Sequence, residues 1–164
     1  MAVRDNFYKD LSWGEKWERI VGLHLILNGV SYISYNNDYR YDIKGTLTGI
    51  PTLWEVKSDR YPKTGNMAIE IRDRGKPSGI SRTEADIFCY VFTNISESFV
   101  YLFFIDVKSL KSLIKDNFDK LRVVKGGDNN EAEIVLIPMK RFQSHFRVKT
   151  VEKRLWDLPD SNLT

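Results

Sequence analysis

The residues best suited to chemistry are an acid and an amine two positions apart, Glu55 and Lys57, in the run Trp54-Glu55-Val56-Lys57. Because side chains alternate faces along a strand, Glu55 and Lys57 are expected on one side and their two apolar neighbours in a core on the other. A rigid element thereby holds a carboxylate beside an ammonium. We expect this face of the strand to carry the active chemistry.

A second acid, Asp42, lies in a strand-like run whose alternation places Tyr41 and Ile43 on the face opposite Asp42. If this strand pairs with the strand that carries Glu55, the two carboxylates meet. Both acids would then lie on adjacent strands of one sheet, within reach of a shared ligand.

A pair of carboxylates suits magnesium, since Mg²⁺ takes oxygen ligands and is usually held by one or two carboxylates plus water and substrate phosphate. Asp42 and Glu55 supply that pair, and the backbone carbonyl of Val56 is a candidate third oxygen. Lys57 can hydrogen-bond an attacking water and offset phosphate charge, because an ammonium acts as a local point charge with a tunable pKa. These residue types predict Mg²⁺-dependent phosphodiester hydrolysis, in which Mn²⁺ can substitute.

The N-terminal segment predicts a helix over residues 12–28 that begins at a capping box and ends before a glycine. It offers two candidates for a third acid, Glu15 and Glu18. At 100° per residue, Glu15 lies nearly opposite the stripe of large apolar side chains, whereas Glu18 lies beside Val21 and Leu25. We therefore favour Glu18 over Glu15 as the helix acid of the site.

Taken in chain order, these features resemble the PD-(D/E)xK nuclease superfamily, most closely its archaeal Holliday-junction resolvases, over about the first sixty residues. The matching positions are a helix glycine, a Glu-Arg pair, the glycine after the helix, the strand aspartate and the Glu-x-Lys motif: Gly14, Glu18-Arg19, Gly29, Asp42 and Glu55-x-Lys57. The residue before the aspartate is a tyrosine where proline is common, and nothing after Lys57 matches the resolvases.

The resemblance implies an α/β fold with a restriction-endonuclease-like core, in which a central mixed sheet is flanked by helices. It also implies that Asp42 and Glu55 bind metal and that Lys57 serves catalysis. Glu18 would be the family's helix glutamate, which orients a water or contributes to a second metal.

The segment 60–82 combines basic residues with glycines and prolines beside the predicted active site. Such a loop suits phosphate contacts, and backbone amides at the start of a helix predicted from Ser81 would add an anion site. The predicted DNA contacts are Arg60, Lys63, Arg72, Arg74, Lys76, Ser78, Ser81 and Arg82. The alternative is a solvated loop whose charges partly cancel against Asp59, Glu70 and Asp73. Glu70 is either an accessory ligand or part of a solvated edge.

A second basic cluster with interleaved aromatic residues follows near the C-terminal end: Lys140, Arg141, Phe142, His145, Phe146, Arg147, Lys149, Lys153, Arg154 and Trp156. It suits a DNA-binding surface that stacks on unpaired bases, or an amphipathic helix and tail that packs on the sheet or on a second subunit. We favour packing. His145 is not favoured as a catalytic base, because the acids and Lys57 already account for proton transfer.

The remaining elements follow from hydrophobic periodicity and turn residues. We expect strands over 30–35, 40–44, 52–57, 67–72, 99–105, 121–124 and 133–137, and helices over 81–92 and 107–118, followed by a polar tail. No linker or repeat interrupts them, so the 164 residues are expected to form a single domain.

The composition, 42% hydrophobic with a net charge of +3, suits a packed domain that binds a polyanion. The single Cys89 excludes an intrachain disulfide and is expected to be buried, and with two histidines a structural zinc site is not expected. No signal segment or membrane-spanning run is evident, so we expect a soluble, cytoplasmic protein.

These features together predict a Mg²⁺-dependent DNA endonuclease, structure-selective in the manner of a Holliday-junction resolvase. The alternative is a sequence-specific restriction-like or homing-type endonuclease, often phage-borne in chains of this size. A homodimer is expected in either case, because one active site cuts one strand. An alternative of another class is a non-catalytic nucleic-acid-binding protein with the same fold.

Overall fold

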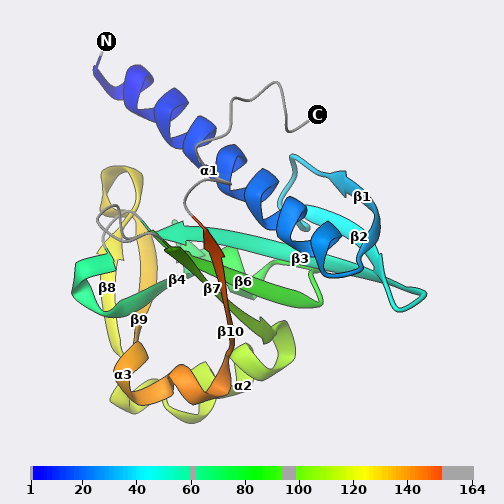
Figure 1. Ribbon diagram of the computed structural model, residues 1–164. Coiled ribbons are helices and arrows are strands. Elements are labelled where there is room, and N and C mark those ends of the chain that lie inside the picture. Colours follow the sequence, from blue (N-terminus) through cyan, green and yellow to red (C-terminus); the bar gives the residue numbers. More distant parts are fainter. Residues whose placement is uncertain (1, 60–61, 94–98, 153–164) are drawn as a thin grey trace.

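The computed structural model describes residues 2–59, 62–93 and 99–152, and shows two sheets with helices around them (Figure 1). The fold is α/β, and its central sheet is mixed, as expected from the sequence. In the described part of the chain, no helix combines the length and the apolar character needed to cross a membrane.

The larger sheet has six strands in the order β1-β2-β3-β6-β7-β10. Their bounds are Ser31–Tyr35 (β1), Ile43–Leu47 (β2), Ile50–Asp59 (β3), Ile87–Phe92 (β6), Phe99–Asp106 (β7) and Arg147–Glu152 (β10). Strands β3 and β6 run parallel, and the other neighbours are antiparallel.

The smaller sheet is antiparallel, in the order β5-β4-β9-β8. Its bounds are Lys76–Pro77 (β5), Asn66–Asp73 (β4), Ala132–Pro138 (β9) and Arg122–Gly126 (β8). The helices are Ala2–Leu27 (α1), Val107–Asp116 (α2) and Met139–Phe142 (α3), and the 3₁₀ turns are Pro62–Thr64 (η1), Gly79–Ser81 (η2), Phe118–Lys120 (η3), Asp128–Asn130 (η4) and Gln143–His145 (η5).

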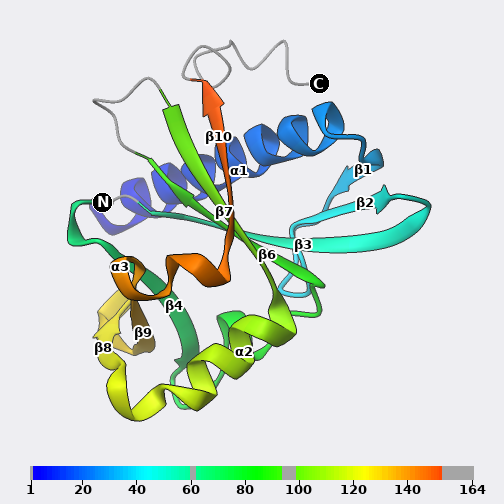
Figure 2. The same cartoon turned by 60° about the horizontal axis from the view of Figure 1, so that its bottom comes forward.

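Two hydrophobic cores lie on the two faces of the six-stranded sheet. The helix-side core joins Trp17 and Val21 of α1 to Trp54 of β3 and Cys89 of β6. The sheet-side core lies between the other face, the smaller sheet and α2, and includes Leu110 of α2. Helices α1 and α2 accordingly lie on opposite sides of the larger sheet (Figure 2). Cys89 is buried and free, as predicted.

The first helix begins earlier than predicted. It starts at Ala2, so Ser12 lies inside α1 and does not cap its N-terminus. The segment 2–12 contains neither proline nor glycine, and helical hydrogen bonding therefore continues through the expected capping box. The helix ends at Leu27, close to the expected boundary.

The helix predicted over 81–92 is wrong. The chain forms the turn η2, then an irregular segment, then strand β6 in the centre of the sheet. Every residue from Ile87 to Phe92 is buried, and a run that is apolar on all sides fits a central strand as well as a buried helix. Its short length and its content of aromatic and β-branched residues were the signals for a strand.

Two of the aromatic residues near the C-terminal end serve packing. Phe142 and Phe146 are buried in the sheet-side core, which excludes them as stacking surfaces for bases. The expected amphipathic helix is the short α3, and the following residues add strand β10 to β7. Lys153, Arg154 and Trp156 lie outside the described residues. The other predicted elements are present with small boundary shifts, among them β7, α2, β8 and β9.

Candidate active site

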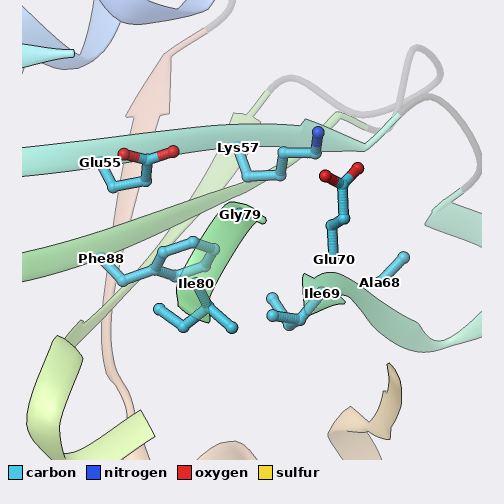
Figure 3. Close-up of a pocket in the computed structure, with 8 residues that line it drawn as sticks. All are labelled: Glu55, Lys57, Ala68, Ile69, Glu70, Gly79, Ile80 and Phe88. Atoms are coloured by element: carbon cyan, nitrogen blue, oxygen red, sulfur yellow. The ribbon is translucent and has the colours of Figure 1, made fainter. Parts of the chain in front are cut away.

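Strand β3 places Glu55 and Lys57 on one face, as the alternation of side chains predicted (Figure 3). Trp54 faces the opposite side, where it is only 1% exposed in the helix-side core. Glu55 is half-buried and Lys57 is exposed. The face that carries both residues is the one directed toward Phe88 of the sheet-side core.

The strand pairing of β3 changes at Trp54. Antiparallel pairing with β2 ends at Trp54, whereas parallel pairing with β6 runs from Trp54 to Asp59. After Trp54, β2 no longer pairs with this edge of β3, and the Asp42 carboxylate takes its place. The Val56 amide donates a hydrogen bond to Asp42 Oδ2 at 2.7 Å. The Asp42 amide donates to the Trp54 carbonyl at 2.9 Å. Asp42 is thereby fixed beside Glu55.

The local structure around Asp42 differs from the predicted strand 40–44. Strand β2 begins only at Ile43, and Asp42 lies just before it. Tyr41 packs against the sheet-side core and Ile43 belongs to the helix-side core, so the expectation that they share a face is wrong. The reason is that alternation holds only within a strand, and the chain bends at Asp42.

Helix α1 supplies a third acid. Glu18 is half-buried and lies near Asp42, while Glu15 is exposed. Burial, followed by repulsion from Asp42 and Glu15, raises the pKa of Glu18 to about 7, against a smaller opposing effect of Arg19. Of the two helix acids, Glu18 is the one the structure brings to the strand acids.

The strand acids are also shifted toward the protonated form. Burial raises the pKa of Asp42 to about 6, although the Val56 amide and Lys57 favour its charged form. Burial and repulsion from Asp42 raise the pKa of Glu55 to about 7, and Glu18 adds to this effect. The three acids, hereafter the acid cluster, are Glu18, Asp42 and Glu55. Charge on Asp42 disfavours charge on Glu18 and Glu55, and a cation beside these acids would offset that repulsion.

A threonine that sequence reasoning missed supports Glu55. The Thr83 hydroxyl lies 2.8 Å from Glu55 Oε2 and 3.0 Å from the Arg40 carbonyl oxygen, and it accepts a hydrogen bond from the Ala85 amide at 3.2 Å. Thr83 is 7% exposed. Its sequence context assigned it to the first turn of a helix that does not form, so no local signal connected it to Glu55.

Glu70 lies in the same pocket as the Glu-x-Lys motif. A cavity of about 70 Å³ is lined by Glu55 and Lys57 of β3, Glu70 of β4, the turn η2 and Phe88. Lys57 and Glu70 extend toward each other across this space (Figure 3). The Ser78 hydroxyl donates a hydrogen bond to Glu70 Oε1. The sequence left Glu70 open between the active face and a solvated edge, and the structure places it at the pocket.

The pocket wall depends on a glycine at a close backbone contact. Gly79 has φ +51°, and a Cβ there would lie 2.4 Å from the Glu70 carbonyl oxygen. Gly75 has φ +73° with open space around it, and is a matched control for the backbone conformation alone. We expect Gly79→Ala to lower the free energy of unfolding by about 2–4 kcal/mol and Gly75→Ala by about 1 kcal/mol, measured by urea denaturation. Equal losses would contradict a steric role for Gly79.

The predicted DNA contacts separate into two groups. Arg72 lies 3.8 Å from Glu133 and Arg74 lies 2.8 Å from Glu131, so the charges of these arginines are partly cancelled. Glu131 and Glu133 come from a distant segment that the sequence did not indicate, whereas Asp73, one of the nearby acids expected from the sequence, also lies 4.0 Å from Arg74. Lys63, Lys76, Ser81 and Arg82 are exposed. Arg60 lies outside the described residues.

The anion site expected at a helix start near Ser81 is wrong, because no α-helix begins there. The Ser81 amide donates to the Ser78 carbonyl, and the Arg82 amide donates to the Gly79 carbonyl, within the single turn η2. The Ser78 side chain is directed to Glu70. This segment therefore supports the pocket wall.

The donor set fits a magnesium ion in its chemistry. Within residues 2–59, 62–93 and 99–152, no three His, Cys, Asp or Glu side chains converge as a ready-made metal site. Magnesium is usually held by only one or two carboxylates, with water and phosphate completing its shell. Asp42 and Glu55 supply two half-buried carboxylates that raise each other's energy when charged. A divalent cation would offset that repulsion.

The raised pKa values predict how stability depends on pH. The folded chain holds protons on Glu18, Asp42 and Glu55 more tightly than the unfolded chain, so the free energy of unfolding falls as pH rises from about 4 to about 7. His24, whose pKa is lowered by burial, acts in the opposite direction. The effect of His24 is the same in the wild type and in Asp42→Asn, whereas the variant lacks the Asp42 carboxylate. We therefore expect the Tm of Asp42→Asn to fall less than that of the wild type between pH 5 and pH 7.5. Equal falls in both proteins would contradict the acid cluster.

Comparison of the chain with protein-family models, with characterised proteins and with solved structures gives no match. The functional argument therefore depends on the residues of the site and their geometry.

Proposed function

We propose that this protein is a Mg²⁺-dependent DNA endonuclease of the PD-(D/E)xK type. The observation that carries the proposal is the acid cluster beside Lys57. Burial raises the pKa of three carboxylates, which come from a helix, a strand start and a strand, and repulsion from Asp42 adds to the shifts of Glu18 and Glu55. Among the described residues, none of the three forms an ion pair with a basic side chain. Such an arrangement destabilises the fold, and a cation-dependent reaction explains its presence.

Asp42 and Glu55 would hold the metal. The Val56 carbonyl is a further candidate ligand, because the amide and carbonyl of one strand residue point to the same edge and the Val56 amide reaches Asp42. When bound, the ion would offset charge on the phosphate oxygens and make a water more acidic. The hydrogen bond from Thr83 holds Glu55 in a fixed orientation for this task.

Lys57 would position the attacking water and offset charge on the phosphate. It projects from the same face of β3 as Glu55, and its positive charge favours the ionised forms of Asp42 and Glu55. Glu18 would orient a second water from the helix side. In a non-catalytic relative, Lys57 would be expected to form a salt bridge away from the acids. Among the described residues it forms no ion pair.

The partner would be DNA, bound through exposed basic residues near the site. Lys63, Lys76 and Arg82 remain as candidate contacts after the ion pairs of Arg72 and Arg74 are set aside. A symmetric resolution or a two-strand cut would need two active sites, and we propose a homodimer for this reason. A structure-selective, resolvase-like enzyme is our first candidate, and a restriction-like or homing-type enzyme is the second.

Cleavage of three labelled DNAs, a four-way junction, a linear duplex and a single strand, tests the function. Wild-type protein is incubated with each in Mg²⁺ or in EDTA, with Glu55→Gln protein purified in parallel to exclude a contaminating nuclease. We expect cleavage only by the wild type and only in Mg²⁺, with the preferred DNA separating the two candidates. Binding without cleavage in Mg²⁺ or Mn²⁺ would instead assign a nucleic-acid-binding protein.

A further inference from the structure

A stacked pair of side chains, Tyr39 and Arg82, lies at the surface of the protein. The Arg82 guanidinium carbon is 3.5 Å from the centre of the Tyr39 ring, and Tyr39 is 53% exposed. The other cation–aromatic contacts in the described part of the chain are 5.0 to 6.0 Å. This pair is therefore in the closest contact, and it presents a flat, cationic surface to solvent.

Each member of the pair is connected to the acid cluster by a short path, one along the chain and one through a hydrogen bond. Tyr39 precedes Asp42 by three positions in the loop that leads into β2. Arg82 is followed by Thr83, whose hydroxyl lies 2.8 Å from Glu55 Oε2. A strand whose phosphate lies at the acid cluster would thus pass near the pair.

The loop that carries Tyr39 is braced on both sides. The Arg40 carbonyl accepts a hydrogen bond from the Glu84 amide at 2.7 Å and lies 3.0 Å from the Thr83 hydroxyl. The Arg40 side chain lies 2.6 Å from Asp38, which also accepts a hydrogen bond from Asn36 at 2.8 Å. These contacts hold the loop against the segment that carries Arg82, so the positions of Tyr39 and Arg82 relative to each other are fixed.

The pair has little to do with the folding core. Tyr39 belongs to neither the helix-side core nor the sheet-side core among the described residues. Aromatic rings and arginine planes bind nucleobases by stacking, and this binding is tolerant of sequence because every base has a flat face. Bases inside a continuous duplex are already stacked on their neighbours. The surface therefore fits a base that is unpaired.

We propose that Tyr39 and Arg82 form a platform that stacks on an unpaired base of a DNA strand that runs past the acid cluster. This inference rests on the proposed nuclease function and names its substrate class: single strands, or branched DNA with exposed bases, in preference to continuous duplex.

Fluorescence of 2-aminopurine, placed in a single-stranded oligonucleotide, reports stacking directly. All titrations are done in EDTA, so that no cleavage occurs. We expect the wild type to bind and quench the probe, Tyr39→Phe to behave like the wild type, and Tyr39→Leu to bind roughly tenfold more weakly with the quenching lost. Tyr32, which is 87% exposed on β1, gives the control variant Tyr32→Leu, which should bind like the wild type.

The proposal is overturned if the wild type does not bind single strands, if Tyr39→Leu binds and quenches like the wild type, or if Tyr32→Leu loses as much affinity. The result is independent of cleavage. A protein that stacks through Tyr39 but cuts no DNA in Mg²⁺ would end the nuclease proposal and leave the platform in place.

Discussion

Asp42→Asn is expected to abolish Mg²⁺-dependent cleavage and to stabilise the fold. The substitution keeps an oxygen that can accept the Val56 amide but removes one of two charged metal ligands. Since a catalytic metal is worth several kcal/mol, we expect the rate to fall by about a thousandfold or more. The substitution also removes repulsion from Glu55 and Glu18, and we expect Tm at pH 7.5 to rise by a few degrees, which corresponds to about 1–2 kcal/mol.

Single-turnover cleavage and thermal unfolding of the same preparation measure both effects. Asp119→Asn, at an exposed position in η3, is the matched control and should change neither quantity. Opposite signs for activity and stability would show that Asp42 is retained for chemistry. A variant that cuts DNA at the wild-type rate, or one that loses both activity and stability, would contradict the role assigned to Asp42.

Lys57→Met is expected to slow cleavage by about 10²–10⁴-fold while DNA binding stays within a few-fold of the wild type. Methionine retains the length of the aliphatic stem and removes only the ammonium, the group assigned to the attacking water. Because Lys57 is exposed, little packing is lost. The effect should therefore appear in the rate of the chemical step.

Lys63→Met is the matched control, since Lys63 is also exposed and lies in η1, shortly after β3. We expect it to weaken DNA binding slightly and to leave the single-turnover rate at saturating protein unchanged. Rates measured under those conditions separate binding from chemistry. If Lys57→Met and Lys63→Met reduce the rate equally, Lys57 acts only as a phosphate contact.

Sequence patterns correctly predicted the site residues whose positions depend on a single helix or strand. The alternation of side chains in β3 placed Glu55 and Lys57 together because a period of two needs no knowledge of the rest of the fold. The helical position of Glu18 beside Val21 likewise predicted that it, and not Glu15, faces inward. The pairing that brings Asp42 to β3 was also correct, although β2 itself starts later than expected.

Contacts between residues far apart in the chain could not be predicted from the sequence in this way. Thr83 reaches Glu55 only because the chain after η2 enters the central sheet as β6, and the apolar run did not distinguish a strand from a helix. Glu70 reaches the pocket because β4 belongs to a second sheet, with β9, and lines the same cavity as Lys57. Glu133 and Glu131, which pair with Arg72 and Arg74, come from the distant hairpin of β8 and β9. None of these pairings has a local signature in the sequence.

Titration of the protein with Mn²⁺ at pH 7.5, followed by the electron paramagnetic resonance signal of the free ion, is the most direct test of a metal-dependent site. We predict saturable binding by the wild type and by Lys57→Met, and loss of that binding in Asp42→Asn. Absence of saturable binding in the wild type, or equal binding by Asp42→Asn, would contradict the assignment of Asp42 and Glu55 as metal ligands.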